Sequence, residues 1–121
     1  MILVDTSVWI NHLRNSEQDL VRILNENRVL CHPYVRGELA LGHLRQREEI
    51  LTALDRLPQA IIPFTDEVHH FIEKHTLYSS GIGLIDIHLL VSAQLAGHTR
   101  IWTYDKRLMT AATQLNLAVD F

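Results

Sequence analysis

Short apolar runs alternate along the chain with longer stretches in which apolar residues recur every three or four positions. The apolar runs are typical of buried strands and lie at residues 2–5, 28–32, 60–64, 100–104 and 117–121. The stretches with helical spacing lie at residues 7–15, 33–44, 47–57, 65–75, 84–97 and 105–116, with a further one that begins at Ser16. This alternation predicts an α/β fold with a central parallel sheet of four to five strands, covered by helices on both faces.

Proline and glycine mark several ends of these elements. Pro33 suits the first turn of a helix, and Gly97 suits the position just after one. Pro63 cannot donate a hydrogen bond to a neighbouring strand, so the third strand is expected to end there or to lie at an edge. Residues 76–83 contain two glycines and are expected to form a loop. No linker or change in composition divides the chain, so we expect residues 1–121 to form a single domain.

The composition is that of an ordinary globular protein, with 47% hydrophobic and 21% charged residues. The single cysteine, Cys31, excludes an intramolecular disulfide framework and fits a reducing compartment. No stretch approaches the roughly 18–20 apolar residues of a membrane span, and the amino terminus lacks the basic start of a signal peptide. We therefore expect a soluble, cytoplasmic protein that is not associated with membranes.

Two aspartates occupy matching positions at the ends of predicted strands. Asp5 and Asp105 each follow an apolar run and precede a helix. Ligands bind outside the carboxyl ends of the strands in open parallel sheets, so both aspartates are expected where function resides. The alternative is that each is a helix N-cap, a position that aspartate favours.

Two further acids lie in predicted helices. Glu38 lies within 33–44 and, taken alone, is equally consistent with a solvated helix face. Asp86 lies among leucine and isoleucine in the most apolar helix, where the alternative is an acid that stabilises the first helical turn. A carboxylate cluster is costly without a cation, and a site of oxygen ligands favours Mg²⁺ or Mn²⁺. Together the four acids therefore predict a divalent-metal site, with phosphoryl chemistry as its leading use.

The net charge of −3 does not by itself suggest a nucleic-acid enzyme. There are 14 acidic residues against 11 lysines and arginines, so setting the four acids aside leaves 10 against 11. The remaining surface is then about neutral, and a basic channel over the site is neither indicated nor excluded.

The ordered motifs of the chain resemble those of the PIN-domain ribonucleases, and most closely the VapC toxins of bacterial toxin–antitoxin pairs. The resemblance runs from end to end and rests on four segments: DTSVWI at the start, VRGEL around Glu38, GIGLIDIHLLVSAQLAG around Asp86 and IWTYDKRL around Asp105. It implies a three-layer α/β/α sandwich with strand order 3-2-1-4-5. It also implies a Mg²⁺- or Mn²⁺-dependent endoribonuclease in which Asp5, Glu38, Asp86 and Asp105 are the catalytic, metal-binding residues.

The resemblance also suggests residues around the acids and partners for the chain. Ser7 and Thr103 match hydroxyl positions that hydrogen-bond the carboxylates, although strand-end and cap hydroxyls are an equal alternative. The implied partners are the RNA substrate, a second copy of the chain in a homodimer, and an antitoxin that neutralises the protein in a hetero-oligomer. Candidate contacts to RNA phosphates are Arg36, Arg45, Lys106 and Arg107.

Some residues have two possible roles. Trp9, Ile10 and Val35 suit either the core, which is favoured, or a groove that binds the antitoxin. Tyr104 suits either base stacking or packing.

Two other functions remain open from the sequence. One is a catalytically silent PIN-like module that binds RNA or a partner, and the other is a nuclease directed at DNA. A receiver-type signalling domain is disfavoured, because Asp5 is followed by Thr6 rather than forming an acidic doublet.

Overall fold

The computed structural model describes all residues, 1–121, and contains three strands and seven helices. The strands are β1 (Ile2–Val4), β2 (Val29–Leu30) and β3 (Arg100–Trp102). The helices are α1 (Thr6–Asn15), α2 (Gln18–Asn25), α3 (Pro33–Leu41), α4 (Arg47–Arg56), α5 (Thr65–Lys74), α6 (Leu84–Ala96) and α7 (Lys106–Gln114). None of the helices is both long enough and apolar enough to cross a membrane.

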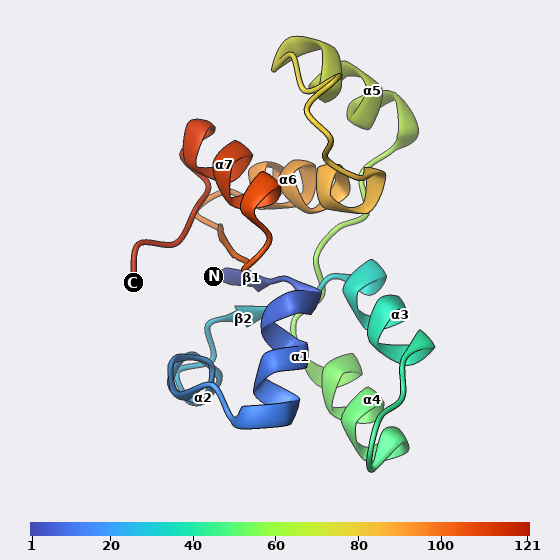
Figure 1. The fold of residues 1–121 in the computed structure, drawn as a ribbon, viewed down its shortest axis with the longest axis vertical. Coiled ribbons are helices and arrows are strands. Elements are labelled where there is room, and N and C mark those ends of the chain that lie inside the picture. The colour runs from blue at the N-terminus through green and yellow to red at the C-terminus, as the bar shows by residue number, and fades with distance from the viewer.

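The three strands form a parallel sheet in the order β2-β1-β3, as the alternating pattern predicts. In the register of the sheet, Leu3 of β1 pairs with Leu30 on one side and with Ile101 on the other. All three residues of β1 are buried. Successive side chains of a strand point to opposite faces, so helices must cover both faces of the sheet. Figure 1 shows α6 and α7 on one side of the strands and α1 and α2 on the other.

The prediction of four to five strands was wrong. Residues 60–64 and 117–121 form no strand, and each outer position of the sheet holds only a single parallel bridge, Cys31 with Gln59 and Ile101 with Ala118. On one side, Pro63 lacks the N–H group that a longer ladder needs, and Ile61 is 63% exposed. The bridges nevertheless flank β2 and β3, where a third and a fifth strand would lie.

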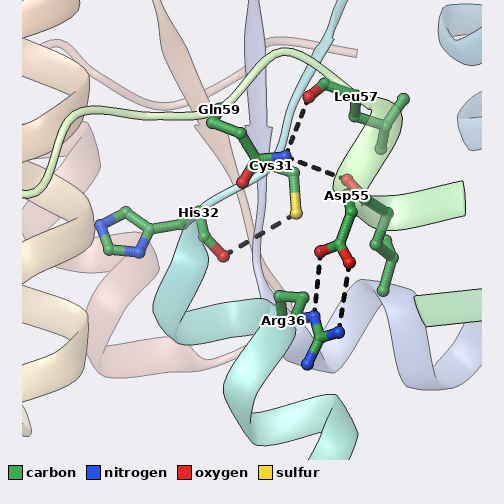
Figure 2. A network of polar contacts seen from close by, with 7 residues as sticks. Cys31, His32, Arg36, Asp55, Leu57 and Gln59 are labelled. Carbon is green, nitrogen blue, oxygen red and sulfur yellow. Dashed lines mark hydrogen bonds and ion pairs between the residues drawn. The ribbon is translucent and has the colours of Figure 1, made fainter. Parts of the chain in front are cut away.

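Polar contacts hold the chain beside β2 at the first of these bridges (Figure 2). The Gln59 side-chain amide donates to Leu57 O over 2.9 Å. In addition, the backbone N–H of Cys31 donates to Pro58 O over 2.8 Å. Cys31 itself is buried, and burial together with nearby Asp55 raises its thiol pKa to about 11. The cysteine is therefore a packing residue and not a reactive thiol.

A buried histidine fixes the chain where β2 ends. His32 Nδ1 accepts a hydrogen bond from the Tyr34 N–H over 3.0 Å, and His32 Nε2 lies 3.0 Å from Ser92 Oγ. The Ser92 hydroxyl donates its only hydrogen to Ile61 O over 2.7 Å, so His32 Nε2 must be the donor in its contact with Ser92. Burial, helped by nearby His88, lowers the pKa of His32 to about 4. The ring is therefore neutral and joins β2, α6 and the segment before α5.

Two helix boundaries differ from the predicted ones. Ser16 has a left-handed backbone, with φ of 55°, and ends α1 instead of beginning the next helix. Because Ser16 turns the chain, α2 begins only at Gln18. The third helix stops at Leu41, short of the predicted residue 44, and leaves an exposed loop that leads to α4.

Candidate functional site

Asp5 lies at the carboxyl end of the central strand and is 5% exposed. It is the residue before α1, yet its side chain makes no cap hydrogen bond. Instead, Asp5 Oδ2 accepts hydrogen bonds from Ser7 Oγ over 2.8 Å and from Thr103 Oγ1 over 2.7 Å. Its other oxygen, Oδ1, receives no hydrogen bond from the protein. The N-cap explanation for Asp5 is therefore wrong, and one carboxylate oxygen stays available to a ligand.

The two hydroxyls that hold Asp5 are themselves held by backbone groups. Ser7 Oγ accepts from the Tyr104 N–H over 3.0 Å, and Thr103 Oγ1 accepts from the Asp105 N–H over 3.0 Å. Each hydroxyl hydrogen is directed toward Asp5, because an ionised carboxylate can only accept and each backbone N–H can only donate. The ends of β1 and β3 and the start of α1 together fix the orientation of this carboxylate.

Glu38 projects from α3 toward the start of α1. Thr6 Oγ1 donates to Glu38 Oε1 over 2.7 Å, which leaves Oε2 without a donor. Glu38 is half-buried, while its helix neighbours Val35 and Leu39 are buried in the core. The residue is therefore held on the inner edge of α3 and is not on a fully solvated face.

Asp105 is the N-cap of α7, and its Oδ1 accepts from the Leu108 N–H over 3.0 Å. The cap explanation holds for this aspartate, in contrast to Asp5. One oxygen satisfies the helix, and Oδ2 receives no hydrogen bond. Asp105 is exposed, so this oxygen can face a ligand or a water molecule.

Asp86 lies in the first turn of α6 and is half-buried. Burial and, after it, the negative charges of Asp5, Asp105 and Glu38 in that order raise its carboxyl pKa to about 6. A carboxylate feels these three charges only if all four side chains share one region of the molecule. The structure therefore brings together acids from β1, α3, α6 and the start of α7.

The region has the chemistry of a divalent-cation site but not a preassembled ligand set. No three acidic, histidine or cysteine side chains in the structure are arranged so as to hold a metal ion. On the other hand, none of the four acids forms an ion pair with a lysine or arginine. Each acid also keeps at least one oxygen without a protein donor. Uncompensated carboxylates repel one another, and hard oxygen donors with this much negative charge suit Mg²⁺ or Mn²⁺.

A family model described as the PIN domain matches residues 2–113 of the chain. The chain belongs to the PIN-domain family. Two relatives, from Mycobacterium tuberculosis strains CDC 1551/Oshkosh and ATCC 25618/H37Rv, are both named Ribonuclease VapC32. Each is 44% identical over 119 residues, which cover 98% of this PIN domain and 96% of the relative. The resemblance to PIN-domain proteins of the VapC type is thereby confirmed.

The basic residues that are candidates for RNA contacts differ in the ion pairs and hydrogen bonds that they form within the protein. Arg36 makes a two-pronged contact with Asp55, at 3.0 and 3.2 Å, as Figure 2 shows. Arg107 lies against Gly81 and donates to Gly81 O over 3.3 Å. Lys106 is exposed in the first turn of α7. The guanidinium group of Arg36 therefore already contacts a carboxylate, and its role as a phosphate contact stays a prediction.

A groove with a volume of about 610 Å³ adjoins Glu38. It lies between α1, α3 and the segment that leads into α4, and Arg14 and Arg45 both line it. Arg45 is one of the phosphate contacts predicted from the sequence, whereas Arg14 is not. The available signal was the spacing Thr6–Ile10–Arg14, which places these side chains on one side of α1, where Thr6 contacts Glu38.

The three apolar residues that suited either the core or a groove lie in different places. Trp9 is 6% exposed and Val35 is fully buried, so both belong to the core. Ile10 is 38% exposed and lines the groove beside Glu38. A smaller apolar hollow of about 190 Å³ lies between α1, α2 and α4, with Leu13 and Leu24 in its wall.

Proposed function

We propose that this PIN domain is a metal-dependent endoribonuclease and the toxin of a toxin–antitoxin pair. The observation that carries the proposal is that hydroxyl donors hold Asp5 and Glu38 by one oxygen each, while no lysine or arginine pairs with either carboxylate. The effect of Asp5, Asp105 and Glu38 on the pKa of Asp86 supports it. The names of the two relatives support ribonucleolytic activity.

We assign Asp5, Glu38, Asp86 and Asp105 to holding Mg²⁺ or Mn²⁺. A bound divalent ion would lower the pKa of water and neutralise charge on a phosphodiester. Asp5 offers the oxygen that Ser7 and Thr103 leave free, and Glu38 offers the oxygen that Thr6 leaves free. The role of the hydroxyls is to keep these carboxylates oriented when charge in the region changes.

The proposed reaction is hydrolysis. Water adds to the phosphorus, the bond from phosphorus to the 3′ oxygen breaks, and the leaving oxygen takes a proton. The products then carry a 5′-phosphate and a 3′-hydroxyl. Products with a 2′,3′-cyclic phosphate would contradict this route, because they require attack by the ribose 2′-hydroxyl.

The test is cleavage of single-stranded RNA by the purified chain with Mg²⁺, with Mn²⁺ and with EDTA. We expect Asp5→Asn to reduce cleavage by more than about 100-fold, since even loss of a residue that only orients a ligand costs about 10–100-fold. Asp19→Asn is the matched control, because Asp19 is an exposed aspartate of α2 that pairs with Arg22. Cleavage that persists in Asp5→Asn, or in EDTA, would contradict the proposal.

The same assay separates the alternatives. A silent binding module would bind RNA without cleaving it in either metal, and a DNA-directed nuclease would cleave single-stranded DNA faster than RNA. We expect cleavage of RNA, because all four acids are present in the sequence and both relatives are named ribonucleases.

We also propose an antitoxin partner and a homodimer. The apolar hollow between α1, α2 and α4 offers a surface for an antitoxin, which would neutralise the protein in a hetero-oligomer. Phe64 is 79% exposed and Leu84 is 61% exposed, which supports burial of these side chains against a second copy. Sedimentation of wild type and Phe64→Ser tests the dimer, and a concentration-independent monomer in the wild type would refute it.

The three-layer α/β/α arrangement belongs to the same proposal. The burial of all of β1 and the helices on each side of the strands support it. An experimental structure with helices on only one face of the sheet would contradict it.

A further inference from the structure

We propose that the groove beside Glu38 binds the phosphodiester backbone of the RNA, and that Arg14 and Arg45 are the residues that hold its phosphates. The groove is the one between α1, α3 and the start of α4, called the arginine groove below. The inference rests on the proposed function and adds to it the path by which the substrate reaches the carboxylates.

The first observation is that the guanidinium groups of Arg14 and Arg45 have no partner within the protein. Both are exposed, and neither forms an ion pair or a hydrogen bond within the protein. By contrast, Arg22, Arg28 and Arg36 are paired with carboxylates. A guanidinium has five N–H donors in a planar fork that matches a phosphate, so Arg14 and Arg45 present unused phosphate-binding groups.

The second observation is the placement of Glu38. It lines the arginine groove, and its Oε1 accepts from Thr6, the residue after Asp5. The groove is therefore continuous with the carboxylate region. A polyanion in the groove would approach four uncompensated negative charges, and the two arginines offset part of that repulsion at the entrance.

The third observation is the composition of the groove wall. Ile10 and Leu13 of α1 line it together with Arg14, while Gln46 and Arg45 line it from the segment before α4. A wall with apolar side chains and free guanidinium groups suits a strand of nucleotides, which offers sugar and base surfaces as well as charge. The volume of about 610 Å³ lies within the range of small-ligand sites, so part of a strand fits within it.

The binding test uses the full chain carrying Asp5→Asn, which holds RNA without cleaving it. The probe is a fluorescein-labelled single-stranded RNA of about 12 nucleotides, followed by anisotropy. We expect Arg14→Gln and Arg45→Gln each to weaken binding about fivefold, the size of an exposed charge pair. The slope of log affinity against log salt should fall by about 0.7 for each lost phosphate contact. Arg28→Gln is the matched control, because it removes an arginine that is paired with Glu26, and we expect it to bind as the parent does.

Cleavage measurements in the chain with Asp5 intact separate this inference from the proposed function. We expect Arg14→Gln and Arg45→Gln to raise KM while kcat stays near that of the wild type. The reason is that a phosphate contact in the groove stabilises the bound substrate and the transition state equally. Failure of the wild type to cleave RNA would refute the proposed function, whatever the arginine variants do.

Two results would overturn the groove proposal alone. One is a wild type that cleaves RNA together with arginine variants of unchanged KM, affinity and salt slope. The other is a pair of variants that bind RNA normally but no longer bind a poly-glutamate peptide that the wild type binds. The second result would assign the groove to an acidic protein partner.

Discussion

The Thr103 hydroxyl donates to Asp5 Oδ2 over 2.7 Å, although the two residues are 98 positions apart in the sequence. Asp5 follows β1 and Thr103 follows β3, so the parallel pairing of these strands brings the two together. The contact holds Asp5 by Oδ2, while Oδ1 receives no hydrogen bond from the protein.

Replacement of Thr103 with valine tests this contact. Valine keeps the shape of threonine but removes the hydrogen bond to a buried carboxylate, which costs about 1.5–3 kcal/mol for a bond to a charged group. We expect Thr103→Val to lower the free energy of unfolding by that amount and to weaken Mg²⁺ binding about 10–100-fold. Denaturant titrations with and without Mg²⁺ measure both effects.

Thr103→Ser is the control for this prediction, because serine keeps the hydroxyl and loses only a methyl group. A Thr103→Val protein that binds Mg²⁺ as tightly as Thr103→Ser would show that the hydroxyl does not orient Asp5.

Charge repulsion among the acids predicts opposite effects of Asp86→Asn on stability and on metal binding. The raised pKa of Asp86 means that the folded protein disfavours its ionised form. Without divalent ions at neutral pH, we expect Asp86→Asn to be more stable than the wild type by about 1 kcal/mol, after allowance for solvent screening. With millimolar Mg²⁺ we expect the wild type to gain melting temperature and the variant to gain little.

The control for Asp86→Asn is Asp66→Asn, since Asp66 is an exposed first-turn acid of α5. Equal increases of melting temperature with Mg²⁺ in wild type and Asp86→Asn would remove Asp86 from the proposed site.

Tyr104 is held rigidly beside the site, which predicts a base-stacking role. Its hydroxyl donates to Glu17 over 2.6 Å, and this bond raises its pKa to about 12. Tyr104 is 52% exposed, and its backbone N–H donates to Ser7 Oγ. We expect Tyr104→Ala to weaken binding of single-stranded RNA about 5- to 100-fold, the range for one stacked base, and Tyr104→Phe to change it little. Anisotropy titrations in the Asp5→Asn background measure both, and equal affinities for alanine and tyrosine would assign the ring to packing.

The buried neutral His32 predicts a loss of stability in acid. Its pKa is lowered to about 4 in the folded protein from an ordinary value of 6.5, so the unfolded chain binds more protons between these values. The free energy of unfolding therefore falls as pH decreases from 6.5 to 4, by about 3 kcal/mol at pH 4. Above pH 6.5 the contribution of His32 is constant.

His32→Asn isolates this effect, because asparagine can still accept the cap hydrogen bond from the Tyr34 N–H but does not titrate. We expect the variant to be less stable overall and to show a shallower decrease between pH 6.5 and 4. Parallel curves for the two proteins would mean that other groups cause the acid sensitivity.

Periodicity predicted most of the secondary structure but not the outer strands. The runs at 2–5, 28–32 and 100–104 contain β1, β2 and β3, because continuous apolar runs suit strands buried on both faces. The runs at 60–64 and 117–121 look equally apolar, yet only single bridges form there. Whether an edge segment pairs depends on neighbouring N–H and C=O groups, which the hydrophobic pattern does not encode.

The types of residue at the candidate site could be predicted from the sequence, but their hydrogen-bond partners could not. The sequence identified the four acids by type and position, and the structure shows that Asp105 caps its helix while Asp5 does not. Both aspartates follow strands and precede helices, so their place between a strand and a helix does not distinguish them. The difference comes from Ser7 and Thr103, whose hydroxyls engage Asp5.

The sequence by itself determined the alternation of strands and helices, the family of the chain and the identity of its acidic residues, because these depend on residue type and spacing alone. The tertiary structure decided which charges are already neutralised. Arg36 and Arg45 look alike in the sequence, yet Arg36 meets Asp55 while Arg45 faces an open groove beside Glu38. Such pairing depends on how helices from separate parts of the chain pack together, and electrostatic energy depends on the resulting distances.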